Sequence, residues 1–441
     1  MNLSPNVAIL GASGLIGSAV ATDLMRHGFR VVAVARRFTA AQRGAFADFA
    51  HECPIAALDV NKLAHVISEW QADIVINCLG ILQNRWHERA DEVHRGFVLR
   101  LLESLRRQER TILLIHLSIP GSAEGDRTIF SRTKRDAEHL IATSSIPFVI
   151  LRPGFVVAPS AYGGSALIRA LAALPFDLPR REAGRPFASI DIGDVAKTIS
   201  ETATRWRAGE KRWNAIWDLM ERHPSTIGGV VDSFRRRFGG PRTIARLPSW
   251  LLETVAHAGD VCALLGWSSP VCTTALREMR RGLEGHPESW IAATGIEPLP
   301  LEETLTGLPS SAQETWFARL YLVKPILLAS LAGFWCASGL IALTVAFPGA
   351  TAILTSHGAP FRLSQGLAIA AGLSDVLVGA AITVRRTCRA GLTAGIVLSM
   401  IYLLGATLIA PELWIQPLGA LIKVVPAIAL MLVGLAILKD R

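Results

Sequence analysis

The chain lacks closely spaced cysteines. No two of its cysteines form a Cys-x-x-Cys pair, since they are scattered as Cys53, Cys78, Cys262, Cys272, Cys336 and Cys388. This spacing argues against a zinc site and against a disulfide framework, and it is typical of a protein in a reducing compartment. We therefore predict that the chain has no metal site.

Acidic residues are scarce in the last third of the chain. Residues 319–441 include nine Lys or Arg but only three Asp or Glu, so this part holds most of the net charge of +9. The rest is nearly balanced and has no basic stripe interleaved with aromatic residues, so we predict no nucleic-acid partner. No basic segment precedes an apolar core near residue 1, and we expect no signal peptide.

Long apolar runs, by contrast, are frequent near the C-terminus. Four follow residue 320, at about 325–347, 363–384, 390–410 and 417–438, and together they contain only two charged residues. Each is long enough to cross a hydrocarbon core of about 30 Å at about 1.5 Å per helical residue. The runs predict an all-α domain of four transmembrane helices over 319–441, in preference to a buried soluble bundle.

The basic residues around these runs indicate how the helices cross the membrane. Those before the first run, between the second and third, and after the fourth are Arg319, Lys324, Arg385, Arg386, Arg389, Lys439 and Arg441. The other two connections contain only Arg362. Because cytoplasmic loops are enriched in Lys and Arg, we expect both termini and residues 1–318 in the cytoplasm.

Two ionisable residues fall inside the apolar runs. Asp375 lies near the middle of the second run, and Lys423 lies near the start of the fourth. A charge at membrane depth is costly unless it is paired or hydrated, so both are candidates for a functional membrane site. The alternative is a mutual ion pair that stabilises the bundle, with Lys423 reaching toward the surface.

A glycine-rich turn follows the first apolar strand. The strand Asn6–Leu10 continues into Gly11-Ala12-Ser13-Gly14-Leu15-Ile16-Gly17, at the start of a helix expected over 15–26. The three glycines permit a tight turn, a close approach of the backbone to phosphates, and close packing of the helix on the strand. The N-terminus of a helix also attracts anions. Residues 11–17 are therefore predicted to bind a dinucleotide pyrophosphate.

Further strands, separated by helical stretches, predict a doubly wound parallel sheet. The second strand, 30–35, ends in Arg36 and Arg37 instead of an acid. An acid would suit the ribose of NAD, whereas paired arginines suit the 2′-phosphate of NADP, so we predict NADP(H) as the preferred cofactor and NAD(H) as the alternative. The later strands are expected at 55–58, 73–79, 111–117 and 147–151, and Asp59 with Val60 after the first of these could meet the adenine.

This succession resembles the short-chain dehydrogenase/reductase superfamily in its extended and atypical branches. The resemblance rests on the glycine turn, Asn77-Cys78-Leu79-Gly80, Ser118, Lys134 within Thr133–Glu138, Leu151–Gly154 and Ser189–Val195. It implies an α/β Rossmann domain over 1–200, with Cys78, Leu79 and Gly80 near the cofactor, and a capping and substrate region over 201–318. The segments 266–270, 294–296 and 316–321 and the apolar runs resemble bacterial fusions of this fold to a DoxX-like membrane domain.

One family residue is missing. Catalytically typical members have a tyrosine four residues before the lysine, and its phenol transfers the substrate proton while the lysine binds the nicotinamide ribose. Here that position is Phe130, which has no ionisable proton. Ser118 could still polarise a carbonyl and Lys134 could still hold the ribose. Tyr162, in the loop after the sixth strand, is the remaining candidate for a proton donor, against the simpler reading of a surface residue.

The middle segment is rich in tryptophan. Residues 201–318 contain seven of the eleven tryptophans: Trp206, Trp213, Trp217, Trp250, Trp267, Trp290 and Trp316. They could pack in a core, form a belt at the membrane surface or line a pocket for a lipidic or quinone-like substrate, and packing or a belt is the more frequent use.

These observations leave several functions open. The first is a membrane-anchored oxidoreductase that transfers hydride from NADPH to an apolar or quinone-like acceptor. The second is a non-catalytic protein in which NADP(H) stabilises the fold or reports redox state to a membrane complex, as implied by atypical relatives of this kind. The third makes the membrane domain the active part, with Asp375 and Lys423 lining a quinone or proton site. The expected location is the inner membrane of a bacterium, with several spans.

Overall fold

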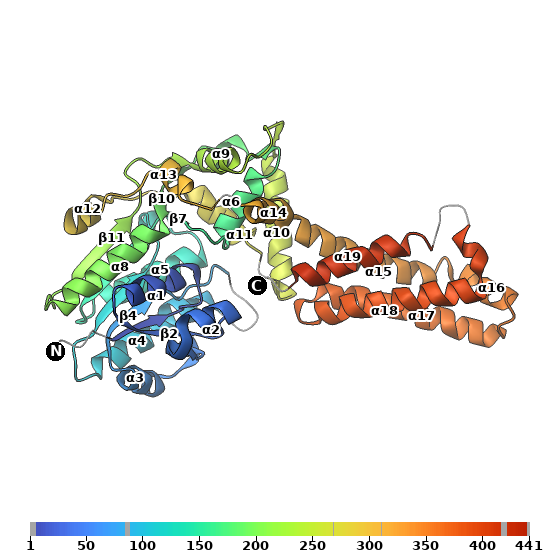
Figure 1. Ribbon diagram of the computed structural model, residues 1–441, viewed down its shortest axis with the longest axis horizontal. Coiled ribbons are helices and arrows are strands. Elements are labelled where there is room, and N and C mark those ends of the chain that lie inside the picture. Colours follow the sequence, from blue (N-terminus) through green and yellow to red (C-terminus); the bar gives the residue numbers. More distant parts are fainter. Residues whose placement is uncertain (1–5, 84–88, 268, 310, 416–420, 439–441) are drawn as a thin grey trace. The chain divides into compact units, whose positions relative to one another are not determined.

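The computed structural model describes residues 6–83, 89–267, 269–309, 311–415 and 421–438 (Figure 1). The chain divides into two compact units. One comprises Met1–Asp260 with Pro270–Ala318, and the other comprises Val261–Ser269 with Arg319–Arg441. The first is an α/β unit and the second is helical.

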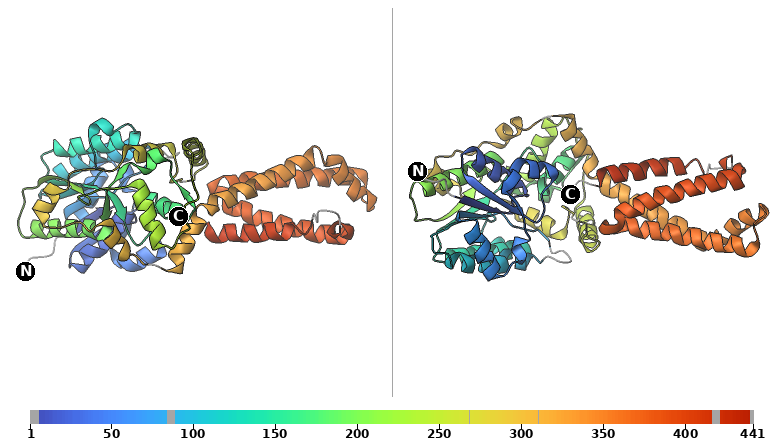
Figure 2. Two further views of the ribbon diagram at one scale, coloured as in Figure 1. Left: turned by 90° about the horizontal axis from the view of Figure 1, so that it is seen from above. Right: turned by 60° about the horizontal axis from the view of Figure 1, so that its bottom comes forward.

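A parallel seven-stranded sheet forms the centre of the α/β unit, in the order β11-β6-β5-β4-β1-β2-β3. Figure 2 shows strands of this sheet with helices on both sides. This confirms the predicted doubly wound Rossmann fold. The strands are β1 (Asn6–Leu10), β2 (Arg30–Ala35), β3 (Ala50–Glu52), β4 (Ala72–Asn77), β5 (Leu113–Leu117), β6 (Phe148–Pro153) and β11 (Asn214–Leu219).

Alternate residues of the strands enter two separate cores. In β1, Val7 and Ile9 join the core beneath α1 (Leu15–Arg26) and α8 (Ile192–Arg207). Ala8 and Leu10 join the core on the other face, beneath α3 (Val60–Glu69), α4 (Phe97–Arg106) and α5 (Ile129–Ala142). Burial on both faces explains why the central strands are almost continuously apolar.

The third strand lies earlier than the sequence predicted. Residues 55–58 were expected to form it, but Ile55–Ala57 is a 3₁₀ turn and Ala50–Glu52 pairs with β2. The N–H of Cys53 makes the last bond to β2, on the carbonyl of Ala35. Pro54 follows and has no N–H to donate, so it cannot continue the ladder.

A smaller core packs beside the carboxyl end of the sheet, and it draws on segments from both sides of residue 200. It includes Val157, Ile168, Val230, Phe234 and Leu305. The elements that supply it include β7 (Phe155–Val157), α6 (Gly164–Ala172), α9 (Ile227–Arg237), α11 (Thr273–Arg281) and α13 (Leu301–Thr306). Other elements of this unit include α2 (Ala40–Phe46), α7 (Arg180–Ala183) and α12 (Glu288–Thr294). The unit boundaries fall within α10 (Ser249–Leu264) and α14 (Ala312–Tyr321).

The helical unit contains five helices in its described part: α15 (Val323–Leu343), α16 (Phe347–Ser356), α17 (Phe361–Thr383), α18 (Arg385–Ile409) and α19 (Val424–Ile437). Of the described helices, α15, α17 and α18 are long and apolar enough to cross a membrane. The fourth expected run, 417–438, falls partly outside the described residues, and its described helix is shorter. The short helix α16 was not expected from the sequence.

The long apolar helices pack closely through glycines. A Cβ atom on Gly339 of α15 would lie 2.5 Å from the carbonyl oxygen of Gly372 on α17. Such small residues allow helix backbones to approach in an apolar environment, where burial of apolar surface does not drive association. In the same unit, the indole N–H of Trp267 donates to the carbonyl of Thr383 at 2.8 Å. The backbone N–H of Arg385 donates to the carbonyl of Leu265 at 3.1 Å.

Candidate functional site

The glycine-rich turn has the geometry that its sequence indicates. Gly11 has φ +90°, and a Cβ there would lie 3.2 Å from the backbone of Cys78. The N–H groups of Gly11 and Ala12 both donate to the carbonyl of Val34, at 2.9 and 3.0 Å. A Cβ on Gly17 would overlap the carbonyl oxygen of Gly11. Both glycines are therefore required by close backbone packing.

The start of α1 offers backbone donors to an anion. Gly14 is the N-cap residue, and no side chain caps this end of the helix. The first helical bond runs from the N–H of Ser18 to the carbonyl of Gly14 at 2.9 Å. The N–H groups of Leu15, Ile16 and Gly17 precede that bond, so they are positioned as the donors of a helix N-terminus usually are. A pyrophosphate fits this arrangement.

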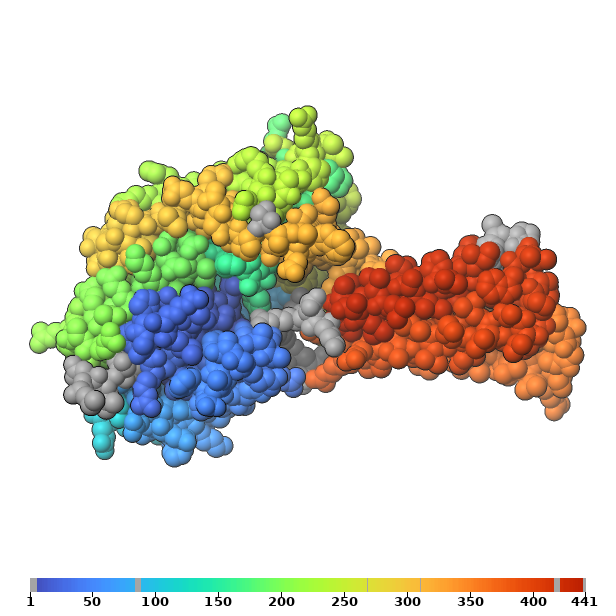
Figure 3. Space-filling model, viewed as in Figure 1, coloured from blue at the N-terminus to red at the C-terminus, as the bar shows by residue number. Residues whose placement is uncertain are grey.

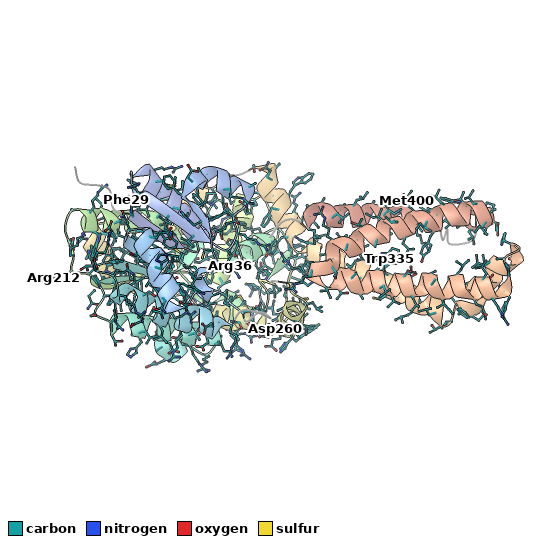
Figure 4. The ribbon with its side chains drawn as sticks, turned by 90° about the horizontal axis from the view of Figure 1, so that it is seen from below. Phe29, Arg36, Arg212, Asp260, Trp335 and Met400 are labelled. Carbon is teal, nitrogen blue, oxygen red and sulfur yellow. The ribbon has the colours of Figure 1, made fainter. Side chains whose placement is uncertain are left out.

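At the end of β2, Arg36 and Arg37 are both exposed; Figure 4 labels Arg36. The acid on the neighbouring strand is already engaged, because Glu52 accepts from the N–H of Phe38 at 2.9 Å and pairs with Arg43 at 3.2 Å. Guanidinium groups suit a phosphate better than a ribose hydroxyl, so this end of the sheet is a candidate phosphate site.

Asp59 has a structural explanation. It is the N-cap residue of α3, and its carboxylate accepts from the N–H of Lys62 at 2.9 Å, which holds the pKa of Asp59 below its usual value. The carbonyl of Val60 accepts from the hydroxyl of Ser104 at 3.1 Å. The expected contact of these two residues with an adenine stays a prediction.

Lys134 lies at the carboxyl ends of β4 and β5. Its Nζ donates to the carbonyls of Leu79 at 3.0 Å and Leu117 at 2.8 Å, and a Cβ on Gly80 would lie 3.4 Å from it. Burial lowers the pKa of Lys134 to about 8, an effect that nearby Cys78 and Glu138 oppose. An ammonium group has three hydrogens, and two carbonyls leave one for a ligand such as a ribose hydroxyl.

The hydroxyl of Ser118 lies near Lys134 on the loop after β5. Ser118 is buried, and its hydroxyl lies beside the carboxylate of Glu138, a hydrogen-bonding contact that helps to lower the pKa of Glu138. Beside it, the carboxylate of Glu138 accepts two hydrogen bonds from the guanidinium of Arg152, at 2.8 and 2.6 Å. It accepts a third from the guanidinium of Arg135, at 2.7 Å. Although burial opposes them, these bonds lower the pKa of Glu138. A buried hydroxyl in such a place can turn from Glu138 toward a bound carbonyl or hydroxyl group.

His94 was missed by sequence reasoning, although it contacts the position of the missing tyrosine. Its ring meets that of Phe130 edge-on, with centroids 5.6 Å apart. Its Nε2 accepts from the N–H of Ile81 at 3.1 Å, and its Nδ1 bonds the hydroxyl of Thr133 at 2.7 Å. Burial, reinforced by Lys134, lowers the pKa of His94 to about 3. With both nitrogens engaged, His94 is a poor substitute for the phenol. It lies in an unusual π-helical turn that no sequence pattern indicated.

Tyr162 is 52% exposed, and its N–H donates to the hydroxyl of Ser165 at 2.9 Å at the start of α6. The hydrogen bonds of Lys134 described above go to backbone carbonyls and not to this tyrosine. A proton-donating role for Tyr162 therefore remains only a prediction.

The capping region contacts the loop that carries Ser118. Arg281, at the end of α11, pairs with Asp126 at 2.8 Å and donates to the carbonyl of Pro120 at 2.6 Å. A Cβ on Gly121 would lie 2.8 Å from the same guanidinium. Asp126 also pairs with Arg135 at 3.0 Å, which joins this contact to Glu138. The network positions the loop.

In the helical unit, Asp375 is satisfied by neutral groups. Its carboxylate accepts from the hydroxyl of Tyr402 on α18 at 2.8 Å and from that of Ser338 on α15 at 3.1 Å. Lys423 is exposed, and no ion pair joins these two residues, both of which are described. The described residues therefore show no mutual ion pair between Asp375 and Lys423, and a functional role of either residue stays a prediction. Nearby in this unit, Trp335 is buried and its indole N–H has no partner among the described residues (Figure 4).

Most tryptophans of the middle segment are packed in the core of the α/β unit. These are Trp206, Trp213, Trp217 and Trp290. Trp250 and Trp316, in contrast, are 66% and 67% exposed. The described residues contain no group of His, Cys, Asp and Glu able to hold a metal ion.

Two family models match separate parts of the chain. A model described as the NAD dependent epimerase/dehydratase family matches residues 7–174, and one described as the DoxX-like family matches residues 332–432. No curated protein matches the chain by sequence. The two matches confirm the expected combination of a nucleotide domain with a DoxX-like domain.

Solved structures resemble the α/β unit. UDP-glucose 4-epimerase from Thermotoga maritima, solved with UDP-glucose, is 16% identical, covers 72% of this chain and 99% of its own, and has a TM-score of 0.51. dTDP-glucose 4,6-dehydratase from Bacillus anthracis, solved with NAD, is 13% identical, covers 69% of this chain and 96% of its own, and has a TM-score of 0.50. A human epimerase family protein, solved with NADPH, is 17% identical, covers 69% of this chain and 100% of its own, and has a TM-score of 0.50. At these identities the likeness shows the fold.

Proposed function

We propose that this chain, in which an NAD(P)-binding domain of the epimerase and short-chain dehydrogenase/reductase type is joined to a DoxX-like domain, is a membrane-attached NADP(H)-binding protein. The observation that carries the proposal is the turn at 11–17, where tight backbone packing precedes an uncapped helix start. Arg36 and Arg37 would bind the 2′-phosphate, and Lys134 would bind the nicotinamide ribose. Bound NADPH would supply a hydride.

The nucleotide domain is proposed to lie in the cytoplasm of a bacterium, attached to the inner membrane. The basic residues near the membrane helices support this orientation, because Lys324 and the turn 385–389 lie at one end of the helical unit. Lys324 contacts the carbonyl of Ile437 at 2.6 Å, so the end of α19 lies there too. Positive charge is retained on the cytoplasmic side.

The geometry favours binding over the tyrosine-dependent chemistry of the family. Phe130 has no proton to give, and both nitrogens of neighbouring His94 are occupied. In this reading NADP(H) stabilises the domain or reports the redox state of the cell to the membrane unit or to a membrane complex.

Hydride transfer is the second candidate, and the buried hydroxyl of Ser118 near Lys134 favours it. Ser118 would donate a hydrogen bond to the oxygen of an apolar or quinone-like acceptor. The ammonium of Lys134, with a lowered pKa, would be the remaining nearby source of the proton.

The test is to measure NADPH binding and NADPH oxidation by the purified full-length protein in detergent, with and without a short-chain quinone. Binding without oxidation is the expected result. Oxidation above background that is lost in Lys134→Ala, with the fold intact by thermal melting, would instead establish the second candidate. Absence of binding to both NADPH and NADH would contradict the whole proposal.

A further inference from the structure

An open groove runs along α17 and α18 in the helical unit, with a volume of about 830 Å³. Its wall is mostly apolar or small, and includes Val378 from α17 and Ala390, Thr393, Ala394, Val397 and Ile401 from α18. The residues from α18 recur every three or four positions, so they lie on one face of that helix. Figure 3 shows the surface of these helices in space-filling form.

One end of the groove is positively charged. Arg386 and Arg389 line it there, both are exposed, and neither forms an ion pair with any residue in the described ranges. They are three residues apart in the first turn of α18, so their side chains share a face. The neighbouring Arg385 points elsewhere, over the ring of Trp267 at 5.8 Å.

The length of the apolar wall matches one half of a bilayer. Ile401 lies twelve residues beyond Arg389, which corresponds to about 18 Å along a helix at about 1.5 Å per residue. Half of a hydrocarbon core is about 15 Å thick. A chain that begins beside the arginines and follows the groove would thus end near the middle of the membrane.

We propose that this groove binds an anionic phospholipid from the leaflet on the side of the α17–α18 turn. Its phosphate would contact Arg386 and Arg389, and one acyl chain would lie along α18. A free phosphate would leave the apolar wall uncovered. The proposal does not depend on the nucleotide, so it can fail or succeed separately from NADP(H) binding.

A helix from a second copy is a less suitable occupant, because its described part would bring no acid to the arginines. In the described part of the helical unit the acids are Asp375 and Glu412. Asp375 is buried between Ser338 and Tyr402, and Glu412 pairs with His357 at 3.0 Å at the opposite end of the helices. The two guanidinium groups therefore need an anion from another source.

Native mass spectrometry of the full-length protein tests the proposal, with phosphatidylglycerol and phosphatidylcholine of the same acyl chains as probes. We expect the wild type to retain phosphatidylglycerol preferentially. Each arginine should contribute about fivefold, so the double variant R386Q/R389Q should bind it about 25-fold less well. R362Q removes an arginine at the other end of α17 and should leave retention unchanged.

A second variant tests the groove itself. Ala394→Trp would fill the wall while keeping both arginines, and it should also abolish the preference for phosphatidylglycerol; thermal melting would show that both variants are folded. Equal retention of the two lipids by the wild type, unchanged binding in R386Q/R389Q or Ala394→Trp, or a lipid-free dimer that the double variant dissociates would each overturn the proposal.

Discussion

At the level of single residues, Phe130 and Lys134 define what this site can do. Phe130 is packed against His94 and has no proton to transfer, whereas Lys134 keeps its place between the carbonyls of Leu79 and Leu117. The groups that would hold a nicotinamide are thus retained while the usual acid is absent. Specificity for the cofactor then depends on different residues, at the end of β2.

The double variant Arg36→Ala/Arg37→Ala should weaken NADPH binding by about 10- to 100-fold, because a charge-assisted bond to a phosphate contributes about 1.5–3 kcal/mol. NADH, which has no 2′-phosphate, should be affected much less. Isothermal titration with both nucleotides measures the difference. Arg30→Ala, at the other end of the same strand, is the matched control, and equal losses for the two nucleotides would refute the preference for NADP(H).

NADPH affinity should also fall as the pH rises through about 8, the lowered pKa of Lys134. Below that pH the ammonium is charged and can donate to the nucleotide, and above it the amine has lost its charge and one donor. Dissociation constants measured from pH 6.5 to 9.5 should therefore increase in the wild type and stay level in Lys134→Gln. The exposed Lys197→Gln should behave like the wild type; if Lys134→Gln does too, Lys134 does not contact the nucleotide.

The same pKa affects stability with the opposite sign. Lys134 binds its proton less tightly in the folded state than in the unfolded state, so between pH of about 8 and its ordinary value of 10.5 the unfolded state holds more protons. The contribution of this residue to the free energy of unfolding therefore increases with pH across that window. Below that pH window, Lys134 is protonated in both the folded and the unfolded state, and the free-energy cost of burying its charge is fully present.

At the level of elements, the packing of α1 against the turn after β1 determines the nucleotide cradle. The sequence predicted these two elements correctly, because a short apolar strand, three glycines and an amphipathic helix are all local patterns. It misplaced β3, because neither 50–52 nor 55–58 is long, and pairing with β2 is decided by neighbours that are distant in the chain.

Gly17→Ala should destabilise the α/β unit by about 1–3 kcal/mol, because the added Cβ would overlap the carbonyl oxygen of Gly11. It should also impair NADPH binding, since the helix must move away from the turn. Gly44→Ala is the matched control: Gly44 lies in α2, and its Cβ would meet nothing within 4 Å. That variant should be as stable as the wild type or about 0.5–1 kcal/mol more stable. Urea denaturation compares them, and equal stability of both variants would contradict the packing argument.

At the level of the whole molecule, two units with different chemistry share one chain. The α/β unit has its own pair of cores around the sheet, and the helical unit has a core of its own that includes Leu331, Trp335 and Leu392. The proposed function requires that the helices cross a membrane and that the α/β unit lies on the side of the basic residues.

That orientation predicts the labelling of single cysteines in a cysteine-free background. His357→Cys, in the connection between α16 and α17, should react with a membrane-impermeant maleimide added outside spheroplasts. Thr387→Cys, in the first turn of α18, should react only after the membrane is permeabilised. Both residues are exposed in the helical unit. The reverse pattern would place the nucleotide unit outside.

The sequence alone determined the features that depend on residues close together in the chain. The glycine turn, the apolar runs, the missing tyrosine and the arginines after β2 each occupy a short segment, and both the expected fold and the DoxX-like domain were found. Tertiary structure alone decided which distant side chains meet. Arg281 reaches Asp126, Arg152 reaches Glu138, and Tyr402 reaches Asp375 only because packed elements bring them together. Contacts across such separations leave no periodic pattern, since their partners are chosen by the burial and hydrogen bonding of the whole fold.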